Sequence, residues 1–301
     1  MTIAACYPCL EGVVLGADST TTIFVPGPTP HSGQQHHYTF CQKVFEFGER
    51  GSSVGIVTWG LGALPHVSYR TLIAEAADAA IASRVGTVED MAKVFAELFW
   101  TEYSTALQQG IQRAQVLDAK DNRTDQEQSE LEYWKQTLSV GFCVGGRWGQ
   151  SRRVEAYEIV FTPLLNSKPA PKRLASGAPM YWGCPTLIER VIFGIDGPLF
   201  QGILGSGKWG GAAEELFDLV RGGQLTPPSE LPIREAVDLV YAEIYTTIKA
   251  MKFSHLAPIC GGPIEIAVVT TDRPFRWVSH KKLSRAITEG HSERAEHDER
   301  Q

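Results

Sequence analysis

Thr2 is placed where a threonine could act as a nucleophile, because only Met1 precedes it in the sequence. A threonine hydroxyl reacts slowly unless a base takes its proton, and the α-amine of the same residue can be that base once it is free. The pKa of an α-amine, about 7.7–8.0, suits proton transfer near neutral pH. Since a small second residue permits removal of Met1, an N-terminal threonine nucleophile is one interpretation. The other is that Met-Thr is the ordinary start of a first strand.

A nucleophile of this kind needs a lysine and a carboxylate beside it. A charged lysine lowers the pKa of the amine and of the hydroxyl, and a carboxylate must offset that charge in a partly buried site. Asp18 ends the run GVVLGAD and Lys43 lies in CQKVFEF, so both fall at ends of predicted strands. Gly60, in TWGLGA, leaves its backbone N–H uncovered for an oxyanion. Taken singly, Asp18 is also a common turn residue and Lys43 a common strand-edge charge.

The order of these residues resembles the proteasome β-subunit family of N-terminal nucleophile hydrolases. The interval from Thr2 to Asp18 matches that family, and GVVLGADSTTT resembles its second strand. Lys43 matches the family's lysine if the segment before it contains an insertion. The resemblance implies that Gly60 is the oxyanion-hole glycine. It also implies that Ser176, in LASGAP, is the serine near the terminal amine.

The resemblance covers residues 2–62 well, and 138–177 and 233–271 loosely. CGGPIEIAVVT is similar to the family's Gly-Gly-then-strand ending. The family's second aspartate, however, falls where this chain has Ala257 and Pro258, and the neighbouring serine is Cys260. These departures keep open an alternative, a catalytically inactive subunit with an assembly or binding role.

The surrounding pattern predicts the elements that would position these residues. Apolar runs predict hairpins over 2–20 and 41–63, and the Pro-, Gly- and His-rich segment 23–39 predicts a loop between them. Helical spacing predicts helices over 68–84, 87–115, 186–195, 212–223 and 231–252. Strands are predicted over 137–148, 152–161, 263–272 and 275–279, and the polar run 118–130 is predicted to be a loop or a frayed helix.

Strands that come in hairpins, with helices between them, predict an α+β fold. The resemblance specifies this fold as a four-layer αββα sandwich of two antiparallel sheets flanked by helices. We expect one domain over 1–285, with insertions near 23–40 and 185–231. The polar tail 286–301 is expected to be disordered.

Other motifs in the sequence have competing interpretations. GILGSGKW, residues 202–209, fits the Walker A spacing until Trp209 replaces the hydroxyl that would hold Mg²⁺, so nucleotide binding through Gly202–Lys208 is a third alternative. CYPC is a single C-x-x-C pair, Cys6 and Cys9, which favours a structural role over zinc. The segment HSGQQHH holds three histidines for which exposure is a simpler interpretation than metal binding: His31, His36 and His37.

Composition narrows the choice of partners. The chain has 301 residues, 43% of them hydrophobic, and its net charge of −6 argues against nucleic acid or an anionic membrane as the main partner. No apolar run approaches the roughly 18–20 residues of a membrane span, and the start lacks the features of a signal peptide. Six cysteines in a chain of this size favour a reducing, cytoplasmic location.

The function predicted from the residues and the resemblance together is hydrolysis of an amide or peptide bond. The substrate would be a peptide or a small amide, with no cofactor and no metal. The resemblance implies self-assembly into a ring or a stacked homo-oligomer. It leaves open whether an ATPase partner exists.

Overall fold

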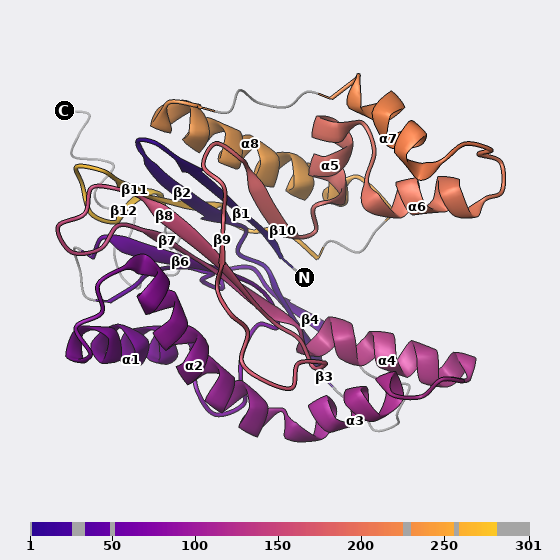
Figure 1. Cartoon of the computed structure of the whole chain (residues 1–301), viewed down its shortest axis with the longest axis horizontal. Coiled ribbons are helices and arrows are strands. Elements are labelled where there is room, and N and C mark those ends of the chain that lie inside the picture. The colour runs from indigo at the N-terminus through magenta and orange to yellow at the C-terminus, as the bar shows by residue number, and fades with distance from the viewer. Residues whose placement is uncertain (1, 26–33, 49–51, 225–229, 256–258, 282–301) are drawn as a thin grey trace, which may run out of the picture.

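A computed structural model of the chain describes residues 2–25, 34–48, 52–224, 230–255 and 259–281 (Figure 1). The fold mixes helices with antiparallel sheets. Three sequence-based expectations lie outside the described residues: those for His31, for Ala257 with Pro258, and for the tail 286–301. Among the described residues, no helix is both long enough and apolar enough to cross a membrane.

The first sheet has five antiparallel strands in the order β10-β1-β2-β11-β12. Its members are β10 (Met180–Gly183), β1 (Ile3–Cys9), β2 (Gly12–Ala17), β11 (Glu265–Thr270) and β12 (Arg276–Ser279). Every residue of β1, β2 and β11 is buried. Their nearly continuous apolar runs therefore reflect cover on both faces of the sheet.

The second sheet also has five antiparallel strands, in the order β5-β6-β7-β8-β9. Its members are β5 (Val44–Glu46), β6 (Val54–Gly60), β7 (Val140–Gly146), β8 (Glu155–Phe161) and β9 (Lys172–Arg173). Apolar side chains of both sheets share one core cluster, including Leu15 and Val269 from the first sheet and Val57 from the second. The two sheets thus pack against each other.

Helices α1–α4 lie along one side of the strands (Figure 1). Their bounds are α1 (Tyr69–Ala82), α2 (Val88–Ala106), α3 (Gln108–Asp118) and α4 (Asp125–Leu138). The Phe99 ring of α2 packs on Phe142 of β7 and Phe161 of β8, with ring centroids 4.7 and 4.6 Å apart. This aromatic contact attaches α2 to the outer face of the second sheet.

The polar run 118–130 differs from its prediction, since its second half begins α4. The Thr124 side chain accepts from the Glu127 N–H, and the Glu127 side chain accepts from the Thr124 N–H. This reciprocal capping box satisfies two donors at the helix start, so a well-formed helix follows a charged sequence. The single helix predicted over 87–115 is divided into α2 and α3 at Leu107.

Helices α5–α8 lie on the opposite side of the strands (Figure 1). Their bounds are α5 (Thr186–Phe193), α6 (Gly197–Gly205), α7 (Ala213–Arg221) and α8 (Ile233–Lys252). Helix α8 crosses β1 and β2, where Gly16 allows close approach. A Cβ at Gly16 would lie 2.6 Å from Val240 and 2.8 Å from Ile244. Helix α6 was not predicted, and the Walker-like residues fall in its last turn and just after it.

Residues 23–39, predicted to be a loop, include parts of two paired strands. The described hairpin arms are β3 (Thr21–Val25) and β4 (Gln34–Tyr38), which form a small separate sheet. Within it the Thr22 hydroxyl is hydrogen-bonded to His37 Nδ1 at 3.0 Å. The β-branched and aromatic residues TTIFV favour a strand locally, which the Pro, Gly and His content of the whole segment obscured.

Candidate active site

The β1–β2 hairpin brings Asp18 next to the start of β1. The register that pairs Ala4 with Ala17 continues to Ile3 and Asp18. The Asp18 N–H donates to the Ile3 carbonyl at 3.1 Å, and the Ile3 N–H donates to Asp18 Oδ1 at 3.1 Å. Thr2, which is buried, is the next residue beyond this pair. The carboxylate is therefore attached to the strand end that carries Thr2.

Lys43 completes a buried ion pair with Asp18. Its Nζ lies 2.6 Å from Asp18 Oδ1 and donates to the Thr20 carbonyl at 2.5 Å. Asp18 is 0% and Lys43 4% exposed. Lys43 stands immediately before β5, and its carbonyl accepts from the Thr58 N–H of β6 at 3.0 Å. The second sheet thus supplies the cation and the first sheet the anion.

The Asp18 carboxylate has donors on both oxygens. Besides Ile3 and Lys43 on Oδ1, its Oδ2 accepts from the Thr20 N–H at 3.1 Å and from the Gly261 N–H at 2.9 Å. Burying a carboxylate is costly unless it is paired and hydrogen-bonded. Four donors around one carboxylate meet that requirement, so Asp18 holds Lys43 in one orientation.

Gly60 ends β6 in a conformation that requires glycine. Its φ is +86°, and a Cβ there would lie 2.4 Å from the Ser139 carbonyl. The Leu61 N–H donates to the Ser139 carbonyl, on the β7 side of the strand. The Thr58 N–H donates to the Lys43 carbonyl, on the β5 side. Since N–H directions alternate along a strand, the Gly60 N–H faces the β5 side, past the end of that short strand. It is thus directed to the side on which Lys43 lies.

These residues surround one cavity of about 290 Å³. Thr2, Lys43 and Gly60 all line it, together with Thr58. The rest of its wall includes Thr21, Tyr38, Trp59, Leu61 and Tyr69. Few polar groups within a mainly apolar wall are typical of a small-molecule or side-chain site.

Ser176 is not part of this cluster. It lines a different pocket with Pro8, and the neighbouring Gly177 N–H donates to the Pro8 carbonyl at 2.7 Å. Pro8 lies near the far end of β1, about 17 Å from Ile3 at the rise of an extended strand. The implied role of Ser176 beside the amine therefore does not agree with its position, because LASGAP forms the approach to β10 instead of its end.

Cys184 takes the place that Ser176 was expected to occupy. The β1–β10 register pairs Ile3 with Gly183, which sets Cys184 opposite Thr2. Gly183 has φ +88°, and a Cβ there would lie 1.9 Å from the Thr2 carbonyl. The signal in the sequence was the short apolar segment MYWG shortly before the helical run TLIERV, which places Cys184 just after a strand end but does not say which strand lies beside it.

Cys260 lies beside the residues that surround Asp18. It directly precedes Gly261, whose N–H binds Asp18, and its thiol is hydrogen-bonded to the Cys184 thiol. Both thiols are buried. The family resemblance puts Cys260 at the position of a serine, and in the structure Cys260 directly precedes the residue whose N–H donates to Asp18.

A second buried carboxylate lies behind Lys43 and was not predicted. Glu265, at the start of β11, accepts weakly from the Lys43 N–H, with Oε2 at 3.4 Å. The same oxygen is 3.4 Å from Lys281 Nζ, and Oε1 is 2.9 Å from His280 Nδ1. Burial lowers the pKa of Lys281, and the Glu265 carboxylate opposes that effect. Glu265 therefore links the backbone just before β5 to the residues that follow β12.

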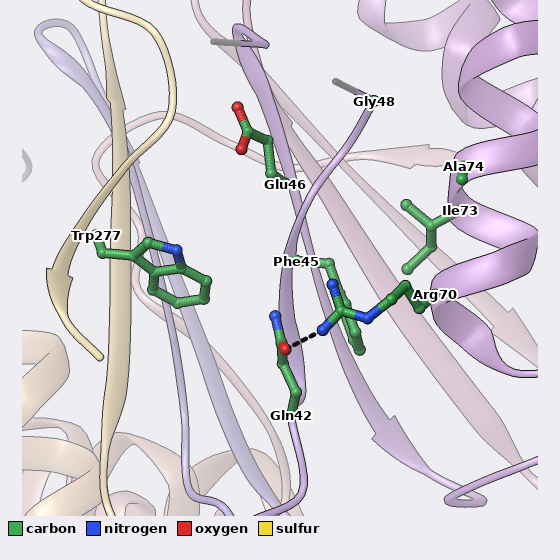
Figure 2. A pocket seen from close by; sticks show the side chains of 8 residues that line it. All are labelled: Gln42, Phe45, Glu46, Gly48, Arg70, Ile73, Ala74 and Trp277. Carbon is green, nitrogen blue, oxygen red and sulfur yellow. Dashed lines mark hydrogen bonds between the residues drawn. The ribbon is translucent and has the colours of Figure 1, made fainter. Parts of the chain in front are cut away.

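A neighbouring pocket of about 200 Å³ shares Gln42 with the main cavity (Figure 2). Arg70 of α1 donates to the Gln42 side-chain oxygen, and its guanidinium lies 5.6 Å from the centre of the Phe45 ring. Gln42 in turn donates to the Val44 carbonyl at 2.8 Å. These contacts hold the backbone on both sides of Lys43. Trp277 of β12 faces them across the pocket (Figure 2).

The competing motifs do not form the sites that they suggested. Cys6 belongs to the core between the sheets and Cys9 to the core beneath α8, so the C-x-x-C pair is divided between two faces of β1. Residues 202–205 end α6 and Lys208 follows in an exposed turn, whereas a Walker A loop joins a strand to the start of a helix. Of the three histidines, His36 and His37 lie on β4.

No protein-family model matches the sequence. No curated protein matches it either. Among solved structures, it is similar to the Anbu (Gly-1) mutant from Hyphomicrobium sp. strain MC1, with a TM-score of 0.45 and 11% sequence identity over 94% of this chain and 89% of that chain. At that TM-score and identity the likeness says nothing about chemistry, and any functional proposal depends on the geometry around Thr2.

Proposed function

We propose that this protein hydrolyses amide or peptide bonds with Thr2 as an N-terminal nucleophile after removal of Met1. The observation that carries the proposal is the buried Lys43–Asp18 pair, which is bonded to the strand end bearing Thr2 and lies at the same cavity as Gly60. Removing two charges from water costs free energy that their attraction offsets only with good geometry and further hydrogen bonds, so a pair buried this completely favours a functional role.

In the proposed reaction the Thr2 hydroxyl oxygen attacks the substrate carbonyl carbon, and the Thr2 α-amine takes the hydroxyl proton. The positive charge of Lys43 favours the deprotonated amine and the developing alkoxide, and Asp18 keeps Lys43 in position. The Gly60 N–H donates to the oxyanion. Collapse of the tetrahedral intermediate releases the amine product, which takes the proton, and leaves an acyl ester on Thr2. Water then hydrolyses the ester and restores the hydroxyl.

The surrounding architecture fits the same proposal. Two facing sheets with α8 against one and α2 against the other correspond to a four-layer αββα sandwich, which we propose as the fold. We also propose a single domain over 1–285, a cytoplasmic location, and assembly into a homo-oligomer. The aromatic and apolar wall of the cavity favours a substrate with an apolar side chain next to the scissile bond.

The test has two measurements on the purified full chain. Intact mass spectrometry should show loss of Met1, because a retained Met1 would convert the amine into an amide and remove the base. Turnover of a panel of fluorogenic peptides and anilides should then fall at least 1,000-fold in Thr2→Ala, with Thr22→Ala as the matched control outside the cavity. Equal turnover in Thr2→Ala and the parent would eliminate this mechanism. Loss of Met1 without turnover of any substrate would favour the inactive assembly subunit.

A further inference from the structure

Two buried cysteines meet between the elements that hold Thr2 and Asp18. Cys184 follows β10 and is set opposite Thr2 by the strand register. Cys260 precedes the Gly261 N–H that donates to Asp18. Both residues lie in the same buried cluster and their thiols are hydrogen-bonded to each other, although the two residues come from distant parts of the sequence. A single bond between the two sulfur atoms would thus join both supports of the proposed site.

The hydrogen bond between the two thiols shifts their pKa values in opposite directions. It lowers the pKa of Cys184, against the effect of burial. The same hydrogen bond and burial raise the pKa of Cys260. A thiolate is the reactive form of cysteine towards oxidants. One thiol of the pair can therefore attack an oxidant while its neighbour resolves the product.

A second thiol pair provides an internal comparison. Cys6 of β1 and Cys143 of β7 are hydrogen-bonded in the core between the sheets, and both are fully buried. Burial raises the pKa of Cys143 well above its ordinary value. This pair has a similar thiol contact but lies in the apolar cluster between the two sheets, so it serves as the comparison pair.

We propose that Cys184 and Cys260 form a reversible disulfide in response to a hydroperoxide. The thiolate of one of these cysteines attacks one oxygen of hydrogen peroxide, breaks the O–O bond and becomes a sulfenic acid, with release of hydroxide. The thiol of the other cysteine then attacks the sulfenic sulfur, forms the S–S bond and releases water. In total, two thiols and one hydrogen peroxide give one disulfide and two waters, with two electrons passing from sulfur to oxygen. A dithiol reductant reverses the reaction.

The consequence for activity rests on the proposed function. A disulfide S–S bond of about 2.05 Å is much shorter than any non-bonded contact between two sulfur atoms. Its formation would draw residue 260 towards residue 184 and shift Gly261, which now binds Asp18 Oδ2 at 2.9 Å. It would also shift Gly183, whose backbone packs on the Thr2 carbonyl. Oxidation should therefore lower turnover at least tenfold, and dithiothreitol should restore it.

The experiment detects the bond without using activity. The full chain is treated with hydrogen peroxide, its free thiols are alkylated under denaturing conditions, and peptides are mapped without reduction. We expect a peptide pair linked through Cys184 and Cys260, with Cys6 and Cys143 alkylated. The inference is overturned if Cys184 and Cys260 are both recovered in alkylated form, or if the linkage joins Cys6 to Cys143 instead.

Variants separate this inference from the proposed function. Cys260→Ser should abolish the linkage, and its turnover should change less than twofold on peroxide treatment, whereas Cys143→Ser should leave the linkage intact. If Cys260→Ser does not fold, the peptide map of the parent chain still decides. A linkage in a protein that turns over no substrate supports the disulfide and contradicts the proposed function. Turnover that falls equally in the parent and Cys260→Ser contradicts the regulatory role of the disulfide.

Discussion

Asp18 and Glu243 are two carboxyl groups buried in the same half of the molecule, but they differ in their hydrogen-bond partners. Asp18 accepts four hydrogen bonds, one of them from the Lys43 ammonium. Glu243, on α8, is 6% exposed, and within the described residues neither of its carboxyl oxygens has a hydrogen-bond partner. Burial raises the pKa of Glu243 to about 8.

The difference shows where the protein maintains buried charge. A buried carboxyl without partners becomes neutral, since protonation avoids the desolvation cost. Beside Thr2 the same cost is offset by backbone donors from three segments and by a lysine from the facing sheet. A charged pair is therefore built at the proposed site, while α8 carries a carboxyl that stays protonated around neutral pH.

The largest effect is expected from breaking the charged pair. Lys43→Met leaves Asp18 buried without its cation, so stability should fall by about 3–5 kcal/mol and turnover at least 1,000-fold. Urea unfolding and turnover of the best substrate measure the two effects. The double variant Asp18→Asn/Lys43→Met should recover most of the stability and none of the activity. Unchanged stability in Lys43→Met would show that the pair is not charged.

The next effect concerns the pH dependence due to Glu243. The folded state binds its proton up to a pKa of about 8, whereas the unfolded chain releases it near 4.5, so stability should decrease as pH rises between these values. The decrease should be about 3–5 kcal/mol. Glu243→Gln cannot ionise and should remove this slope in urea unfolding between pH 5 and 8.5. Glu235→Gln, exposed on the same helix, should keep it. An identical slope in both variants would contradict the raised pKa.

The smallest effect should come from removing one partner of Glu265, which has more partners than Glu243 and fewer than Asp18. Lys281→Met removes one cation, but Glu265 keeps His280 and the Lys43 N–H. We expect a stability loss of about 1–2 kcal/mol, smaller than for Lys43→Met. Lys208→Met, at an exposed lysine of the turn after α6, should change stability by less than about 0.5 kcal/mol. A loss in Lys281→Met as large as in Lys43→Met would place Lys281 among the groups that hold the site.

Local sequence predicted much of what surrounds Thr2. Apolar runs punctuated by turn residues indicated the β1–β2 hairpin and the β5–β6 hairpin, and hairpin register follows from short-range geometry. Asp18 and Lys43 could therefore be assigned to strand ends before the structure was known. Helices α5, α7 and α8 were also predicted, because amphipathic spacing is a local property. Helix α6 was not predicted, since its glycine and proline content resembles that of a loop. The strands β3 and β4 were not predicted either, because the segment that includes most of both is rich in proline, glycine and histidine.

What the sequence determined by itself is the set of residues whose chemistry is unusual at their positions: a threonine after the first methionine, an aspartate and a lysine at strand ends, and a glycine at the end of a predicted strand. Tertiary structure alone decided which other groups join them. The pairing of β1 with β10 sets Cys184, not Ser176, opposite Thr2, and the approach of the segment before β11 adds Cys260. Burial of Glu243 and Glu265 likewise depends on which faces of α8 and β11 are turned towards the interior of the protein. Such contacts join residues far apart along the chain, and no local pattern encodes their register or the solvent that they exclude.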